Sequence, residues 1–340
     1  LRFKLSPYHV EESINTYCEA NKDSINIMSL NAQSIFSKID KLKILIEEMK
    51  IKHKSVIHIV SIQEGHITAE KSKSQIEIDD YELFIEPSKI GKKGGIAVYV
   101  HNSLKGNPVK FFEESPSKLW EGLSIDVTGS TLAKPIRIHT VYRPPREKQE
   151  PENHEIFMFE FEPYLKKIKA DSTDCVIVGD INYNLLECSS NRMCQEYFDA
   201  MISHEFIPEI TLPTKLNRNS CKLYDHIFTR FKTEKLKTMS CVYLKDVSDH
   251  LPVILSIKNN NIHTELPKFR YTRDTSKENV AKYLKLIEEQ IALTQYETSL
   301  TSNPNINYDK LNKTLTSIYN DTFPVKKIRV TKYNTKVAHG

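Results

Sequence analysis

Residues 175–185 read Cys-Val-Ile-Val-Gly-Asp-Ile-Asn-Tyr-Asn-Leu, and this stretch decides the fold that we expect. Cys175–Gly179 is an apolar run of strand length that stops at Asp180, where core packing alone would favour another apolar residue. Asp180 and Asn182 stand two positions apart, so on extended backbone both side chains would leave the same face. The stretch therefore predicts a buried strand that delivers a carboxylate and an amide to one point at its end.

Polar side chains mark the ends of other apolar runs as well. Asn31 and Glu64 each follow shortly after such a run, Tyr142 and Arg143 end a third, and His250 precedes a fourth. Taken singly, a polar residue at a strand end is far more often a turn residue than a catalyst. Taken together they point to a site, because loops at strand ends are where a rigid scaffold carries chemistry.

The rest of the core contains further predicted strands and three predicted helices. Apolar residues at spacings of three and four predict helices over Ser37–Lys50, Glu155–Lys169 and Arg192–His204. Strands outnumber helices and several follow one another directly, which favours a layered α+β architecture with extensive sheet. The other predicted strands are Ile25–Leu30, Val56–Ile62, Tyr81–Ile85, Ile96–Val100, Leu123–Val127, Ile136–Tyr142, His226–Thr229, Thr238–Tyr243 and Val253–Ile257.

The strand pattern breaks at Asn259–Asn261, and the sequence that follows is different in kind. Thr275–Ile291 and Tyr308–Tyr319 carry helical stripes. We therefore divide the chain into an N-terminal extension (1–23), a main domain (24–258) and a helical appendix (259–340).

Composition describes an ordinary globular protein and excludes several classes. Of 340 residues, 39% are hydrophobic and 27% are charged, and the net charge of +4 is too mild to indicate a nucleic-acid binder by itself. Most of that charge follows residue 261. The longest apolar runs fall far short of the ~20 residues that a membrane helix needs. The six cysteines show neither a C-x-x-C pair nor a zinc spacing, which favours reduced thiols in an intracellular protein.

The polar residues at strand ends form a chemical set. Glu64 offers the hard oxygen ligand that Mg²⁺ prefers, and Asp180 and Asn182 place a carboxylate and an amide together. His250 can hold or donate a proton near neutral pH, and Asp225 could orient it from the far ring nitrogen. A metal, an oriented water, an amide and a His–Asp pair are what phosphodiester hydrolysis needs, because a cation must neutralise charge as it builds.

Seven stretches within residues 25–257, taken in order, resemble motifs of the endonuclease/exonuclease/phosphatase superfamily. They look most like the apurinic-type endonuclease domain of non-LTR (LINE-type) retrotransposons. One motif alone would be a weak signal, whereas seven in the right order are a strong one. The stretches are Ser29–Ser34 with Lys38, Ser61–His66, Lys93–Val100, Tyr142–Pro145, Val178–Leu185, Leu223–Thr229 and Ser248–Val253.

The resemblance implies a four-layer α/β/β/α sandwich with the active site at one edge of two packed sheets. It implies that Asn31 and Glu64 belong to the metal site, with Glu64 the principal Mg²⁺ ligand and Mn²⁺ a possible substitute, and that Asp249 helps to hold the metal or its water. The remaining implied roles are catalytic: Tyr142 contacts the scissile phosphate, Asp180 deprotonates the attacking water, Asn182 holds a phosphate oxygen, and His250, paired with Asp225, stabilises the charge of the phosphorane.

The last part of the chain carries a resemblance of its own. Phe269–Asp274, Ser276–Asn279 and Thr322–Lys327 resemble the connector between endonuclease and reverse transcriptase in such elements. This implies the front part of a longer polyprotein that nicks double-stranded DNA and leaves a 3′-hydroxyl to prime reverse transcription. The implied partners are the target DNA, the element RNA and a reverse transcriptase domain, with no membrane. Action in the nucleus is implied, although no clear localisation signal is present.

Three departures from the family pattern stand out, and none removes a catalytic side chain. Gly65–His66 replaces the usual Thr and apolar residue, and Tyr224 replaces the usual Ile before Asp225. The connector ends as Asn334–Gly340 instead of running into a Pro–Trp pair.

Two other functions stay open at this stage. One is an apurinic/apyrimidinic repair endonuclease or another phosphodiesterase of the same superfamily, and the other is a non-catalytic nucleic-acid-binding fragment of a decayed element. Because the main domain is near neutral, DNA contacts would have to come from local patches, for which Lys92, Lys93, Arg143 and Arg146 are the candidates.

Overall fold

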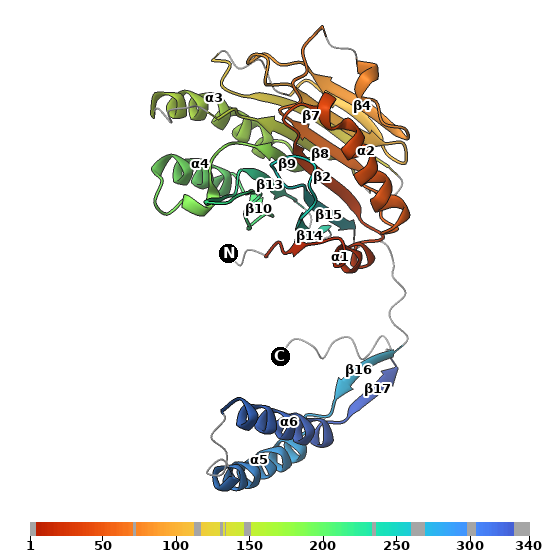
Figure 1. Cartoon of the computed structure of the whole chain (residues 1–340), viewed down its shortest axis with the longest axis vertical. Coiled ribbons are helices and arrows are strands. Elements are labelled where there is room, and N and C mark those ends of the chain that lie inside the picture. The colour runs from red at the N-terminus through yellow and green to blue at the C-terminus, as the bar shows by residue number, and fades with distance from the viewer. Residues whose placement is uncertain are drawn as a thin grey trace. The chain divides into compact units, whose positions relative to one another are not determined.

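The computed structural model divides the chain into two units, Leu1–Asn261 and Ile262–Gly340, which are treated separately below (Figure 1). The structure describes residues 5–70, 73–111, 117–129, 132, 134–145, 151–232, 236–259, 269–297 and 304–329.

A seven-stranded sheet forms one half of the first unit, in the order β1-β14-β15-β2-β3-β5-β4 (Figure 1). At its centre β2 and β3 run parallel, with Asn31 opposite Gln63, and β15 pairs antiparallel to β2. The strands are β1 (Tyr8–His9), β2 (Ile25–Asn31), β3 (Ile59–Gln63), β4 (Tyr81–Glu86), β5 (Ile96–His101), β14 (Leu236–Tyr243) and β15 (Val253–Asn259).

A six-stranded sheet, in the order β10-β13-β9-β8-β7-β6, forms the other half. Its central strands β8 and β9 are also parallel, with Tyr142 opposite Asp180, and β13 pairs antiparallel to β9. The strands are β6 (Lys105–Val109), β7 (Glu121–Thr128), β8 (Ile136–Tyr142), β9 (Asp174–Asp180), β10 (Ile207–Pro208) and β13 (Asp225–Arg230).

Helices cover the outer face of each sheet, so the unit has four layers (Figure 1). In the first sheet, α2 (Ile35–Ile51) crosses from β2 to β3; in the second, α3 (Pro151–Ala170) crosses from β8 to β9. Both are crossover connections between parallel strands, which require a long segment such as a helix. The remaining helices are α1 (Ile14–Ala20), α4 (Arg192–Ser203) and the short 3-10 turns Lys73–Ile76 and Leu185–Glu187.

Three hydrophobic clusters fill the spaces between these layers. Strand β2 shows the arrangement, because Ile27 packs between the sheets whereas its neighbour Met28 packs against the helices. Successive side chains of a strand point to opposite faces, so a strand buried on both faces reads as a continuous apolar run. The predicted α/β/β/α sandwich is confirmed.

The N-terminal segment, which we predicted as an extension, packs against the sheets of the first unit. Tyr8–His9 pairs with β14, and Tyr17 of α1 is 4% exposed, with its hydroxyl 2.7 Å from Ser256 Oγ.

Strand β3 starts later than predicted, at Ile59. The sequence pattern missed β6 because Gly106 and Pro108 interrupt it, as an edge strand tolerates.

The second unit contains a two-stranded sheet in addition to the expected helices. Three aromatic side chains of this unit pack together, Tyr283, Tyr319 and Phe323, with ring centroids 5.0–5.9 Å apart. The guanidinium of Arg273 lies 4.8 Å from the Tyr319 ring centroid. Its elements are β16 (Phe269–Arg273), α5 (Lys277–Glu297), α6 (Pro304–Thr322) and β17 (Val325–Arg329).

No helix among the described residues combines the length and the apolar character that crossing a bilayer requires.

Buried histidines should make the first unit sensitive to acid. Burial lowers the pKa of His139 to about 3 and that of His226 to about 4. Below pH 6.5 these two histidines bind protons in the unfolded chain but stay neutral in the folded chain. The free energy of unfolding therefore falls as the pH drops towards their folded pKa values. At pH 5 each histidine should lower the free energy of unfolding by about 2 kcal/mol, at 1.36 kcal/mol per pH unit.

Urea unfolding followed by circular dichroism at pH 7.5 and pH 5 checks this prediction. His139→Asn should remove about one histidine's share of the difference, because asparagine does not titrate. If the variant and the unaltered protein lose stability equally between the two pH values, His139 is not the cause.

Candidate active site

The carboxyl ends of the two central parallel strand pairs bring the predicted residues together. Asn31 ends β2 and Glu64 follows β3, while Tyr142 ends β8 and Asp180 ends β9. Parallel neighbours deliver their last residues to the same edge of a sheet, and the two sheets pack face to face. This arrangement explains why residues 149 positions apart, such as Asn31 and Asp180, are in direct contact.

The antiparallel neighbours of these pairs supply the other half of the site. Asp225 is the first residue of β13 and lies directly opposite Asp180 in the register. His250 stands just before β15, whose Val253 pairs with Ser29 near the end of β2. The starts of the antiparallel strands β13 and β15 therefore lie next to the ends of their parallel-paired neighbours β9 and β2.

Asp180 is the centre of this arrangement. It is 1% exposed; its Oδ2 accepts a hydrogen bond from Asn31 Nδ2 (2.7 Å), and its Oδ1 accepts one from the backbone N–H of Asn182 (2.9 Å). Burial raises the pKa of Asp180 to about 7, with the Asp225 carboxylate adding to the increase and His250 opposing it. A carboxylate with this pKa can take a proton near neutral pH.

Asp225 and His250 form a buried pair, as predicted. His250 Nδ1 lies 2.8 Å from Asp225 Oδ2, which also accepts a hydrogen bond from the Thr214 hydroxyl at 2.6 Å. Burial alone would lower the pKa of His250, but Asp225 and then Asp180 outweigh it and raise the pKa to about 9. The sequence pattern did not indicate Thr214, which fixes the orientation of the pair.

Glu64, Asn31 and His66 form the part of the site that fits a divalent cation. Glu64 Oε2 accepts a hydrogen bond from Asn31 Nδ2 at 3.0 Å, and Glu64 Oε1 lies 3.6 Å from His66 Nε2. That ring nitrogen is buried and has no hydrogen-bond partner among the described residues, so a shared cation would satisfy it. Glu64 and His66 both have left-handed backbone, with φ of +50° and +51°, a conformation that residues other than glycine adopt rarely.

A second group of ligating atoms lies beside the first. Asp180, Asp225 and His250 each place one such atom within 4.8 Å of the others. The Asp225–His250 hydrogen bond already uses two of these atoms, which favours a proton-transfer role for this group.

Tyr142 is 1% exposed and faces the same carboxylates. Burial, together with Glu64 and Asp180, raises the pKa of Tyr142 well above its usual value, so the hydroxyl stays protonated and acts as a donor. Beneath it, a buried polar chain joins the two sheets, because the Ser61 hydroxyl lies 2.9 Å from the Thr140 hydroxyl and 2.7 Å from Gln63 Nε2.

Asn182 and Arg143 differ from what we predicted. Strand β9 ends at Asp180 and Asn182 has a φ of +55°, so the two side chains do not leave one face of an extended strand. Asn182 Nδ2 instead donates to the carbonyl of Arg143 at 2.7 Å. Arg143 is 6% exposed, with its guanidinium 4.2 Å from the Tyr183 ring centroid, so it supports this loop and is not a DNA contact.

Asp249 lies beside a lysine that the sequence analysis did not single out. Its Oδ2 lies 3.0 Å from Lys215 Nζ. Burial by itself would raise the pKa of Asp249, but Lys215 outweighs it and holds the pKa below its usual value. The metal-holding role of Asp249 stays a prediction.

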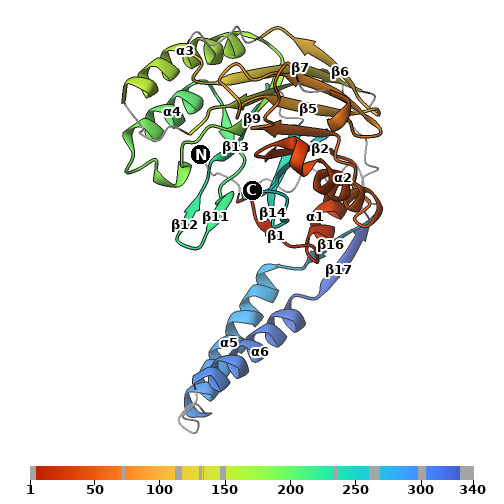
Figure 2. The same cartoon turned by 45° about the horizontal axis from the view of Figure 1, so that its top comes forward.

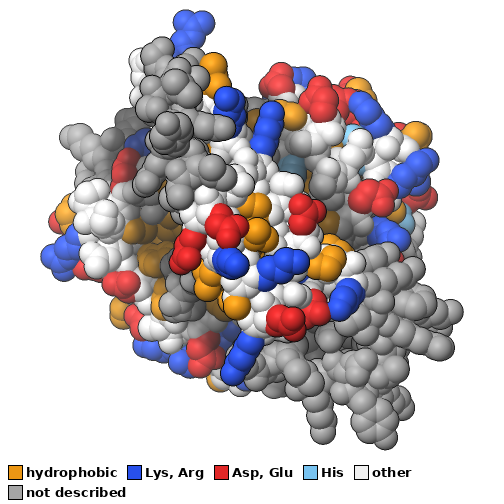
Figure 3. Space-filling model, turned by 90° about the horizontal axis from the view of Figure 1, so that it is seen from below, with side chains coloured by type: hydrophobic (Ala, Val, Ile, Leu, Met, Phe, Trp, Pro, Cys, Tyr) orange, Lys and Arg blue, Asp and Glu red, His pale blue; other side chains and the backbone are white. Residues whose placement is uncertain are grey.

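The other candidate DNA contacts lie on a loop before β5. Lys92 and Lys93 are exposed, and the loop is anchored by Glu121, whose carboxylate accepts hydrogen bonds from the backbone N–H of Lys89 (2.6 Å) and Gly95 (2.8 Å). Arg146 lies outside the described residues. Figure 3 shows Lys and Arg side chains interspersed with Asp and Glu side chains among the described residues.

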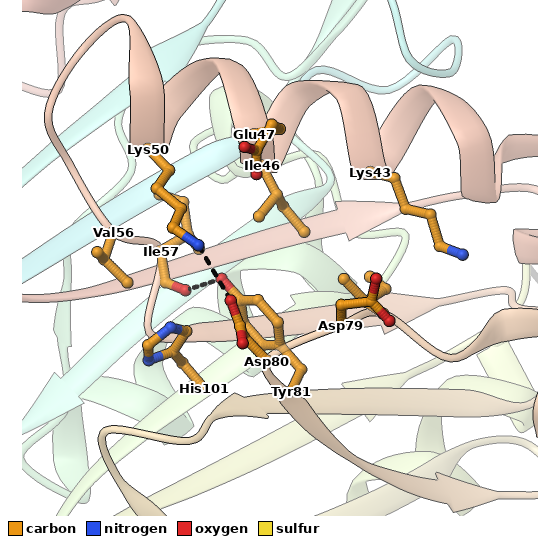
Figure 4. Close-up of a pocket in the computed structure, with 11 residues that line it drawn as sticks. Lys43, Ile46, Glu47, Lys50, Val56, Ile57, Asp79, Asp80, Tyr81 and His101 are labelled. Carbon is orange, nitrogen blue, oxygen red and sulfur yellow. Dashed lines mark hydrogen bonds and ion pairs between the residues drawn. The ribbon is translucent and has the colours of Figure 1, made fainter.

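A hollow of about 230 Å³ lies between α2 and the β4–β5 edge, and none of the candidate site residues lines it (Figure 4). Lys50 Nζ pairs with Asp80 Oδ2 at 3.0 Å, and the Tyr81 hydroxyl donates to the Ile57 carbonyl. These contacts link residues that line the hollow. The described side chains there do not form a catalytic set.

Comparison with solved structures defines the class of fold. The chain is similar to a 3′-5′ exonuclease (NExo) from Neisseria meningitidis, with 16% identity over 69% of this chain and 100% of that one and a TM-score of 0.52. It is also similar to the AP endonuclease LMAP from Leishmania major, with 12% identity over 75% of this chain and 93% of that one and a TM-score of 0.54.

A further similar structure is the endonuclease domain of TRAS1, a telomere-specific non-LTR retrotransposon, with 13% identity over 70% of this chain and 99% of that one and a TM-score of 0.48. No family model and no curated protein matches the sequence. The two structures with TM-scores above 0.5 show that the first unit has the endonuclease/exonuclease/phosphatase fold.

Proposed function

We propose that this protein is a divalent-cation-dependent nuclease that hydrolyses a phosphodiester bond of DNA. The observation that carries the proposal is the row of contacts from Glu64 through Asn31 and Asp180 to the His250–Asp225 pair. In this proposal Glu64 binds the cation, the buried Asp180 is the base, and His250 is the oriented imidazole. Hydrolysis of a diester requires these three functions.

The residues of the chain would divide the reaction as follows. Asp180, held by Asn31 and Asn182, takes a proton from the attacking water. His250, oriented by Asp225, donates from Nε2 to the phosphoryl oxygen, and the Tyr142 hydroxyl donates to the same phosphate. Glu64 and Asn31 would hold a divalent cation, for which we propose Mg²⁺, and it would neutralise the negative charge that builds on the phosphate and on the 3′-oxygen, which leaves and takes a proton from water.

More specifically, we propose the endonuclease of a non-LTR retrotransposon. Support comes from the order of the seven sequence motifs and from the segments after residue 268 that resemble a connector. The proposed product is a nick with a 3′-hydroxyl in double-stranded DNA, made in the nucleus, which then primes reverse transcription of the element RNA by a polymerase domain.

Nicking of supercoiled plasmid in the presence of Mg²⁺ tests the proposal. Glu64→Gln should lower the nicking rate at 1 mM Mg²⁺ by about 100-fold, with partial recovery at higher concentrations, because the carboxylate ligand is lost. Glu82→Gln, which changes an exposed carboxylate on β4, is the matched control and should nick like the unaltered protein.

Chelation by EDTA should abolish nicking and leave the circular dichroism spectrum unchanged, since few protein ligands hold the cation. Failure of the unaltered protein to nick would sink the proposed activity. A strong preference for abasic over intact DNA would favour a repair endonuclease.

A further inference from the structure

Lys215 enters the active site from the β11–β12 hairpin and contacts two of its residues. The hairpin, β11 (Lys215–Asn217) and β12 (Ser220–Lys222), projects from the edge of the sandwich next to β13 (Figure 2). Lys215 Nζ lies 3.0 Å from His250 Nε2 and 3.0 Å from Asp249 Oδ2. Its side chain is 22% exposed, so most of the side chain is shielded from solvent.

The backbone holds Lys215 beside His250. A β-bridge joins these two residues, and the N–H of Leu251 donates to the carbonyl of Thr214 at 2.7 Å. The N–H of Thr214 donates to the carbonyl of Lys222 at 2.8 Å. These contacts fix the start of the side chain on both sides, so the approach of the ammonium group does not depend on a flexible loop.

The charge of the site gives this lysine a function. Four carboxylates surround the position where the phosphate would lie, and they would repel it: Glu64, Asp180, Asp225 and Asp249. In the row of contacts, Glu64 stands at one end and Lys215 at the other, with Asp180 between them. A cation at Glu64 and an ammonium group at Lys215 would therefore place positive charge on both sides of the base.

The geometry also identifies the atom that Lys215 would contact. An ammonium group only donates hydrogen bonds, and a phosphate oxygen only accepts them. Lys215 Nζ and His250 Nε2 are 3.0 Å apart, so Nε2 accepts from the ammonium group while the imidazole is neutral. Once Nε2 is protonated both atoms are donors, and one anionic oxygen can contact both. We propose that Lys215 is a phosphate-binding residue of the active site that contacts the same nonbridging oxygen as His250. The proposal rests on the proposed nuclease function and adds a residue to it.

Salt-dependent binding of a duplex oligonucleotide, with Ca²⁺ in place of Mg²⁺, measures this contact without relying on cleavage. Lys215→Met should reduce the slope of log K against log salt by about 0.9, the value for one phosphate contact, and Lys215→Arg should restore it. Lys222→Met is the matched control, because Lys222 lies opposite Lys215 in the hairpin but pairs with Glu187. It should leave the slope unchanged.

Single-turnover nicking with Mg²⁺ completes the test. Lys215→Met should lower the rate by about 100-fold with an unchanged unfolding temperature. If the unaltered protein nicks and Lys215→Met keeps both its rate and its slope, the lysine proposal fails and the nuclease proposal stands.

If the unaltered protein does not nick but the slope falls by about one contact, the phosphate contact stands and the nuclease proposal fails. A loss of nicking with an unchanged slope and no rescue by Lys215→Arg would show a structural lysine and overturn the proposal. A protein that neither nicks nor binds DNA would overturn both.

Discussion

Asp180→Asn is expected to lower the rate of nicking by about 10³- to 10⁴-fold while the protein stays folded. The amide has the shape of the carboxylate and can still accept the hydrogen bond from the N–H of Asn182, but it cannot take a proton from water. With the pKa of Asp180 near 7, the rate of the unaltered protein should rise with pH through neutrality, and this rise should be absent from the variant. Single-turnover plasmid nicking between pH 5.5 and 8.5 measures both effects.

Asp174→Asn is the matched control for this experiment. Asp174 is also buried and stands on the same strand, at the opposite end, where its carboxylate accepts a hydrogen bond from the N–H of Lys232 at 2.6 Å. It should nick within about twofold of the unaltered protein, since it is remote from the proton transfer. Equal rates for Asp180→Asn and the unaltered protein would remove Asp180 from the mechanism.

The strands of the core could be predicted because most of them are buried on both faces. Val176 and Val178 of β9 pack between the sheets, whereas Ile177 packs against the helices, so the run is continuously apolar. Strands β11 and β12 could not be predicted, because they are three residues long and largely exposed. Short exposed strands form through backbone pairing that leaves no periodic side-chain pattern.

The candidate site could be predicted to the extent that each of its residues interrupts an apolar run. Asp180 and Asp225 stand where packing alone would favour an apolar residue, and the structure places them opposite each other. Thr214 and Lys215 lie in an ordinary polar stretch, and only the fold brings them to residues up to 35 positions away. Arg143 was wrongly assigned because a polar residue after a strand reads the same whether it faces solvent or stacks on a buried ring.

Gly179→Ala is expected to destabilise the first unit by more than about 4 kcal/mol, a large part of the stability of a typical domain. Gly179 has a φ of +147°, and a Cβ atom there would lie 1.8 Å from the carbonyl oxygen of Val141. That oxygen belongs to β8, the parallel neighbour of β9, so the backbone of one strand would have to move away from the other. Thermal and urea unfolding followed by circular dichroism measure the loss.

Gly91→Ala separates crowding from backbone strain. Gly91 also has a positive φ, of +121°, but a Cβ atom there would meet nothing within 4 Å, so the substitution should cost only about 1–2 kcal/mol. A similar loss for both variants would mean that the approach of β8 and β9 at Gly179 is unimportant. The close approach of the two strands at Gly179 also matters for the site, because it sets Tyr142 opposite Asp180 at the end of the paired strands. The glycine before Asp180 therefore serves the position of the base that we propose as much as the stability of the sheet.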